Sequence, residues 1–128
     1  MATTDTRARN QAKAELESIS EMVVALNSED DDAREVAVKE IHEDPLSVEV
    51  RSGWTTPGQN MEPAEYCILL CTGGPAVRII GDLDEYTEPA IFARLEYQDW
   101  ETPWTPYPLS SDEEETLVSY AQQFYFGS

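Results

Sequence analysis

Two cysteines and one histidine are the side chains that could supply a nucleophile or bind a soft metal: Cys67, Cys71 and His42. A thiolate activated by an imidazole is a common nucleophile, and the same groups bind zinc. The cysteines lie four positions apart in an apolar run that predicts a strand, so we expect both side chains on one face. Their Cα atoms would then be about 13 Å apart, beyond the ~7 Å limit of a disulfide. Core packing is the favoured interpretation, because free cysteine is often buried as a small apolar side chain.

The remaining motifs match no common catalytic or metal-binding pattern. Residues 71–75, Cys-Thr-Gly-Gly-Pro, lack the lysine and the following helix of a phosphate-binding loop and instead predict a hairpin turn. The acidic run from Glu29 to Asp32 lacks the glycine and the distant glutamate of a calcium loop. We therefore expect a binding protein without metal or cofactor. A small enzyme that uses Cys67, Cys71 or His42 is the catalytic alternative.

Net charge is the most unusual property of the sequence. The chain carries 26 acidic and 8 basic residues, a formal net charge of −18. Arg7, Arg9 and Lys13 fall within the first 13 residues, so the other 115 carry 25 acids and 5 bases. Such a charge repels nucleic acid and anionic membranes and attracts basic surfaces. We expect a protein partner with a basic surface, although acidity also serves solubility alone or reflects a halophilic host.

Three acidic clusters are the candidate partner-binding residues. Acids at a helix start each contribute about 0.3–1 kcal/mol through the helix dipole, but four in succession exceed that need and repel one another. A basic partner that binds these acids would explain why there are more of them than the helix start needs. The clusters are Glu29, Asp30, Asp31, Asp32 and Glu35 at the second helix, Asp82, Asp84 and Glu85 in a turn, and Asp112, Glu113, Glu114 and Glu115 at the last helix.

An aromatic and proline-rich loop is the second candidate site. It contains Trp100, Trp104 and Tyr107. One interpretation is that the loop folds back and covers the sheet. The other is that Trp100 and Trp104 anchor a partner, because exposed tryptophan and tyrosine concentrate binding energy at interfaces.

Helical and alternating periodicity predict the elements that position these residues. The predicted helices span residues 5–26, 29–43 and 111–125, with Ser28 capping the second, and Ser111 with Glu114 forming a capping box for the third. The predicted strands span 46–52, 65–72, 76–82 and 90–98. Leu46, Val48 and Val50 should point to one side of the first strand. Short connections favour an antiparallel sheet with the helices on one face, a two-layer α+β domain formed by residues 1–128.

Neither a membrane span nor a secretory signal is expected. No stretch approaches the ~20 apolar residues that a membrane-spanning helix needs. Residues 1–7 lack the apolar core of a signal peptide. We therefore expect the protein in the cytoplasm of a host bacterial cell, with reduced cysteines.

Three segments carry a resemblance to known sequences. Asp44–Trp54, Cys71–Arg78 and Leu95–Trp100 look like small uncharacterised proteins of phages and mobile elements, a resemblance that covers about residues 44–126. In class, a compact acidic protein of this size is similar to anti-CRISPR and anti-restriction proteins, several of which place carboxylates where nucleic-acid phosphates would lie.

That similarity implies a phage-type inhibitor that binds the basic nucleic-acid channel of a host defence complex and acts as a DNA mimic. An immunity protein or antitoxin that masks one basic toxin or nuclease is the alternative. The sequence leaves the oligomeric state open, and also whether the acidic clusters form one surface.

Overall fold

The helices form because apolar side chains recur every three or four residues and meet the sheet. The computed structural model describes residues 3–99 and 102–126. α1 (Thr3–Leu26) is the longest helix, followed by α2 (Asp31–Glu43) and α3 (Ser111–Ala121). Their buried residues include Ala8, Ala12, Leu16, Ile19 and Val23 from α1, Ala37 and Ile41 from α2, and Leu117, Val118, Tyr120 and Ala121 from α3.

The start of α2 differs from the prediction. Its N-cap is Asp30, whose carboxylate accepts a hydrogen bond from the Asp32 N–H at 3.0 Å. The Ser28 hydroxyl instead accepts from the Asp30 N–H at 3.1 Å. The predicted Ser28 cap and start at residue 29 are therefore wrong, because Ser28 shapes the turn that leads into the cap.

The start of α3 at residue 111 is confirmed, but its capping residues and its end differ from the prediction. The capping box uses Ser110 and Glu113, one residue earlier than predicted: the Glu113 N–H donates to the Ser110 hydroxyl, and the Ser110 N–H to the Glu113 carboxylate. The helix ends at Ala121 rather than 125. A tight turn follows, in which the Phe124 N–H donates a hydrogen bond to the Ala121 carbonyl. The centroid of the Phe124 ring lies 5.5 Å from that of the Tyr120 ring.

Five antiparallel strands form the sheet in the order of the chain. Short turns join most of them, which favours this order. The fifth strand was not predicted, because two residues in a proline-rich segment carry no alternating pattern; they pair with Tyr97 and Glu96. The strands are β1 (Ser47–Ser52), β2 (Pro63–Cys71), β3 (Ala76–Leu83), β4 (Pro89–Gln98) and β5 (Thr105–Pro106).

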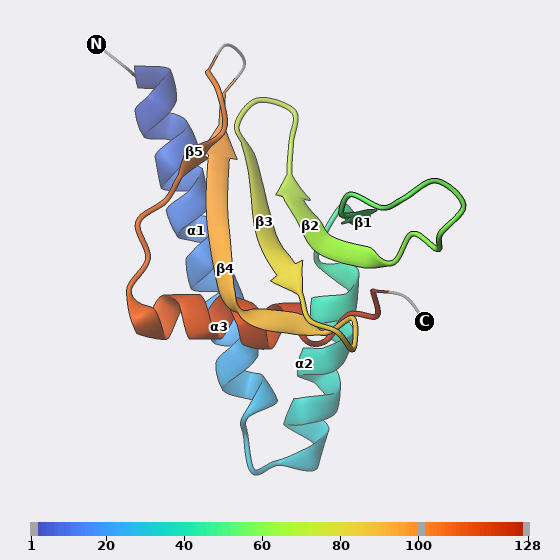
Figure 1. Ribbon diagram of the computed structural model, residues 1–128. Helices are drawn as coiled ribbons and strands as arrows, with labels where there is room; N and C mark the ends of the chain where they lie inside the picture. The colour runs from blue at the N-terminus through green and yellow to red at the C-terminus, as the bar shows by residue number, and fades with distance from the viewer. Residues whose placement is uncertain (1–2, 100–101, 127–128) are drawn as a thin grey trace.

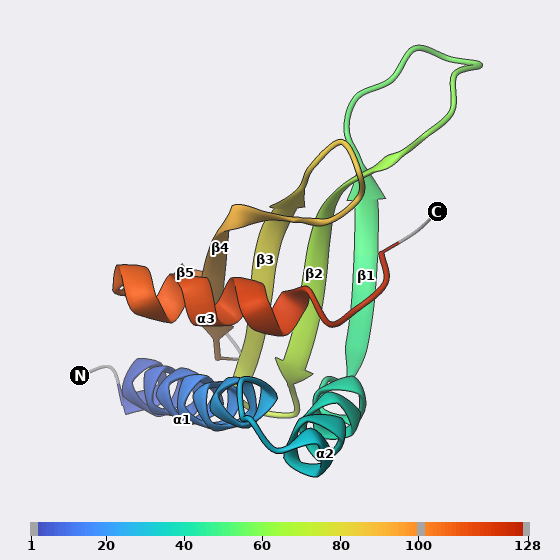
Figure 2. The same ribbon diagram turned by 90° about the horizontal axis from the view of Figure 1, so that it is seen from below.

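The three helices lie on one side of the sheet (Figures 1 and 2). α1 and α3 pack against each other and against β4, and α1 also contacts β3. The core between the layers includes Tyr66, Ile68, Val77, Ile79 and Leu95, all at most 1% exposed. The α+β class and the antiparallel sheet are thus confirmed. None of the described helices is long and apolar enough to cross a membrane.

β1 departs from the expected burial. Val48 packs against the core, whereas Leu46 is 60% exposed and Val50 is 43% exposed. β1 is the edge strand of the sheet, next to β2, while α1 and α3 pack over β3 and β4. The apolar side of β1 is therefore only partly covered.

Candidate partner-binding surface

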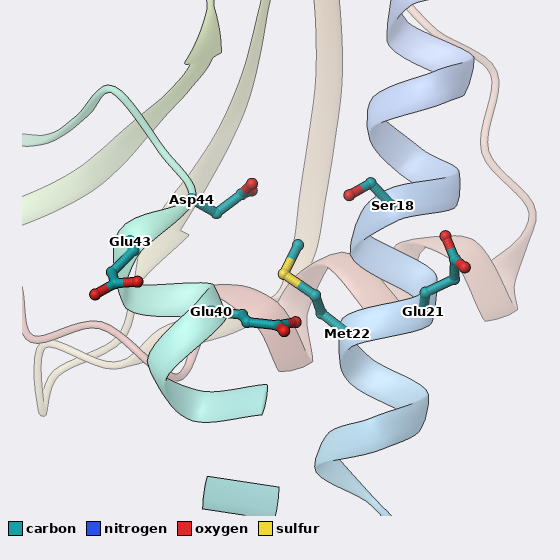
Figure 3. A pocket seen from close by; sticks show the side chains of 6 residues that line it. All are labelled: Ser18, Glu21, Met22, Glu40, Glu43 and Asp44. Atoms are coloured by element: carbon teal, nitrogen blue, oxygen red, sulfur yellow. The ribbon is translucent and has the colours of Figure 1, made fainter. Parts of the chain in front are cut away.

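A hollow between α1 and α2, called here the acidic groove, gathers carboxylates from both helices (Figure 3). Its volume is about 490 Å³. On each helix the lining residues follow the i, i+3, i+4 spacing that places side chains on one face. They are Ser18, Glu21 and Met22 from α1, and Glu40 and Glu43 from α2 with its C-cap residue Asp44.

The acidic groove has no basic side chain in its lining. Glu40 and Asp44 point toward α1 in Figure 3, and the Met22 side chain lies between the two helices. Asp44 accepts a hydrogen bond from the Tyr120 hydroxyl at 2.7 Å, which fixes its carboxylate. Across the described part of the chain, no ion pair involves Glu21, Glu40 or Glu43. These three carboxylates are exposed and free to meet a positive charge.

The helical pair as a whole concentrates negative charge. Residues 14–44 contain eleven acids and two bases. One of the bases, Arg34, pairs with Asp31 and also donates to the Ser28 carbonyl at 2.6 Å, so it serves the turn before α2. On the inner side of α1, burial raises the pKa of Glu15 above its ordinary value. We call residues 14–44 the acidic hairpin.

The three predicted acidic clusters do not form one surface. Glu29–Asp32 and Glu35 lie at the start of α2, Asp82–Glu85 at the β3–β4 turn, and Asp112–Glu115 at the start of α3, three well-separated places in Figure 1. The acids that are brought together come instead from two helices, α1 and α2. Sequence reasoning missed Glu21, Glu40 and Glu43, although their helical spacing was a readable signal.

Several of the predicted acids have structural roles. Asp84 accepts hydrogen bonds from the N–H groups of Tyr86 and Glu88, at 2.8 and 3.1 Å, and so closes the β3–β4 turn. Glu113 completes the capping box, and Glu114 accepts from the Ala93 N–H at 3.2 Å. These hydrogen bonds within the chain account for the presence of the three acids without a binding partner. Asp82, Glu85, Asp112 and Glu115 remain exposed.

The aromatic loop folds back on the sheet. The Arg78 guanidinium lies 4.0 Å from the centre of the Trp104 ring, a cation–π contact on the face away from the helices. Arg78 also pairs with Glu96 at 2.8 Å. Trp104 is thereby half-buried. Trp100 lies outside the described residues. A different tryptophan, Trp54 in the β1–β2 loop, is fully exposed, and the sequence reasoning did not single it out.

The two cysteines face opposite sides of the sheet, contrary to the expectation. Cys67 pairs with Ile80, on the face away from the helices. A register shift between Leu69 and Cys71 places Cys71 opposite Val77, and Cys71 packs against the core. The irregularity adds a residue and so reverses the alternation. A shared site for both thiols is excluded by this geometry.

Neither thiol has the environment of an activated nucleophile. Burial raises the pKa of Cys67 and of Cys71, and the Glu15 charge raises that of Cys71 further. His42 Nε2 lies 2.7 Å from the Gln123 carbonyl, and its ring lies 5.8 Å from Phe124. Over residues 3–99 and 102–126, no group of three or more His, Cys, Asp and Glu side chains is placed to hold a metal ion.

Slow thiol chemistry is the expected consequence. At neutral pH, iodoacetamide should label both cysteines several-fold more slowly in the folded protein than in urea, because a raised pKa lowers the thiolate fraction. The rate should rise as the pH increases above the ordinary thiol pKa. Cys67→Ser and Cys71→Ser variants assign each rate. A thiol that reacts faster in the folded protein would contradict this expectation and favour the enzyme alternative.

Comparisons with protein-family models, with curated proteins and with solved structures find no match for this chain.

Proposed function

We propose that the chain is an acidic inhibitor that binds the basic nucleic-acid-binding surface of a host defence complex. The acidic hairpin is the contact surface. It places carboxylates where nucleic-acid phosphates would lie and so excludes the nucleic acid. The observation that carries the proposal is the acidic groove, whose lining carries carboxylates from both helices and no basic side chain.

The distribution of bases supports the hairpin over the rest of the surface. Within the described chain, five of the six arginines form ion pairs, and three of these, Arg51, Arg78 and Arg94, project from the strands. They offset nearby acids on the sheet. The hairpin contains the Arg34–Asp31 pair, but its eleven acids face only two bases, so most of its negative charge is not offset. Clustered charges of one sign steer a partner of opposite charge and speed its association.

Salt dependence is the first property to measure. The tagged protein is incubated with lysate from a bacterium that carries an active CRISPR effector, at about 0.1 and about 0.5 M NaCl. We expect capture of a nucleic-acid-binding complex at low salt, weakened at high salt, and displaced by duplex DNA. Mass spectrometry identifies the captured proteins.

Two variants of equal net charge locate the contact. One carries Glu21→Gln, Glu40→Gln and Glu43→Gln in the acidic groove. The control carries Glu62→Gln, Glu85→Gln and Glu88→Gln, all exposed and outside the hairpin. We expect the groove variant to weaken binding about tenfold or more, and the control to change it little. Equal losses would show that net charge alone matters and would refute a specific hairpin contact.

The identity of the captured protein decides between the remaining alternatives. A single small basic toxin or nuclease, held at both salt concentrations, would replace the defence-complex proposal with an immunity or antitoxin function. If DNA fails to displace the captured complex, competition for the nucleic-acid site is wrong.

A further inference from the structure

The outer edge of β1 is open. β1 is the last strand on its side of the sheet, and within the described part of the chain no strand pairs with its outer side (Figure 2). An edge strand presents unpaired N–H and C=O groups that can accept another strand. We propose that a second copy of this chain occupies this edge, so that two β1 strands pair antiparallel around a two-fold axis at Val50.

The charges of β1 are self-complementary in that register. Glu49 and Arg51 both project on the sheet face away from the helices, because they pair with Cys67 and Glu65 of β2 on that face. With Val50 on the axis, Glu49 of one copy lies opposite Arg51 of the other, and the reverse pair forms by symmetry. Opposite charges that face each other across antiparallel strands stabilise the pairing.

The apolar residues of the edge fit the same register. Val50 lies on the helix side of the sheet opposite Tyr66, yet it is 43% exposed. On the axis it would meet Val50 of the second copy. Leu46 falls near Trp54 of the second copy, and both residues are largely exposed in one chain. Pairing would therefore cover apolar surface that the helices leave open.

Charge also selects this edge over the rest of the molecule. Two chains of −18 repel each other, and an approach through the acidic hairpin would bring carboxylates against carboxylates. β1 carries one acid and one base, so it is electrically neutral. Arg51 already pairs with Glu65, but the Arg51 side chain is 79% exposed and has donors left for a second carboxylate.

Sedimentation equilibrium of the full chain tests the proposal. It is run between about 10 µM and about 1 mM protein, in about 0.15 M salt to limit the repulsion between copies. We expect a monomer–dimer equilibrium for the wild type. A chain that stays monomeric at the highest concentration would overturn the proposal. The same monomeric result is expected if the β1 edge binds a different protein instead of a second copy.

Charge-swap variants test the register. Glu49→Arg places two like charges across the axis on each side, and so does Arg51→Glu. Each should weaken dimerisation about tenfold or more. An equimolar mixture of the two variants should recover the wild-type association as a heterodimer, and the double variant E49R/R51E should recover it as a homodimer.

Matched controls separate the edge from net charge. Glu85→Arg changes the charge as Glu49→Arg does, and Lys39→Glu changes it as Arg51→Glu does. Both residues are exposed and lie outside β1, Glu85 in the β3–β4 turn and Lys39 in α2. They should leave the dissociation constant within about twofold of that of the wild type. A dimer that responds equally to the controls and to the edge variants forms elsewhere, which overturns the proposal. Recovery in the mixture also shows that both edge variants fold.

Discussion

Replacing Gly81 with alanine should lower the free energy of unfolding by about 1–3 kcal/mol. Gly81 pairs with Tyr66 on β2, and the tyrosine ring lies across the glycine. A Cβ at position 81 would lie 2.4 Å from the Tyr66 Cζ and hydroxyl oxygen. That separation is far inside van der Waals contact, so the ring or the strand must move.

The ring has little freedom to move away. Tyr66 is 1% exposed, and its ring centroid lies 4.9 Å from that of Phe126. On the other side of Gly81, β4 contributes the small residue Ala93. A displaced ring would have to disturb this buried packing, and close-packed interiors transmit such strain.

Gly53→Ala is the matched control. A Cβ at Gly53 would meet the Ala64 Cβ at 3.9 Å, an ordinary contact. That variant should keep its stability within about 0.5 kcal/mol or gain slightly, because alanine restricts the unfolded chain. Urea denaturation of both variants compares them under one condition. Equal stability of the two variants would show that the Tyr66 ring does not lie across Gly81.

Periodicity predicted the layers of this fold because it reports burial directly. The apolar spacing of α1, from Ala8 to Val23, gave the correct buried face. The antiparallel sheet followed from the short turns. The cap of α3 was placed one residue late because Ser110 and Ser111 are followed by acids at both possible spacings. The local sequence therefore fits a capping box that begins at Ser110 as well as one that begins at Ser111.

The candidate surface was harder to predict because it depends on how elements lie against each other. The acidic runs at Glu29–Asp32 and Asp112–Glu115 were visible as runs, yet they lie at separate helix ends. Glu21 and Glu40 lie 19 positions apart in sequence and share one groove only because α1 and α2 pack side by side. The sheet face on which the Cys71 side chain lies depends on a register shift between β2 and β3, and no residue pattern predicted that shift.

Two buried tyrosines allow the contribution of a buried hydroxyl group to stability to be tested with and without a hydrogen-bond partner. Tyr66 and Tyr120 are 1% and 0% exposed. Burial raises the pKa of Tyr66 to about 12 and that of Tyr120 above its ordinary value as well, with the Asp44 hydrogen bond and charge adding to the rise for Tyr120. Both hydroxyls therefore stay protonated across the neutral range, and their partners differ.

The same substitution should destabilise the fold at Tyr120 but not at Tyr66. The Tyr120 hydroxyl donates to Asp44, so Tyr120→Phe removes a bond to a carboxylate and should cost about 1–2 kcal/mol. The Tyr66 hydroxyl has no hydrogen-bond partner among the described residues. Tyr66→Phe should therefore leave stability unchanged or raise it by up to about 1 kcal/mol, because an unsatisfied buried group is removed.

Alkaline pH gives an independent readout of the Tyr66 site. An ordinary tyrosine ionises near pH 10, whereas Tyr66 in the fold ionises at about 12. The stability that Tyr66 gains from staying neutral is complete below about pH 10 and is lost as the pH rises toward about 12. Tyr66→Phe should remove that part of the alkaline decline. If both phenylalanine variants lose stability equally at neutral pH, a hydroxyl partner exists at Tyr66, and the cross-strand packing of Tyr66 on Gly81 has to be revised.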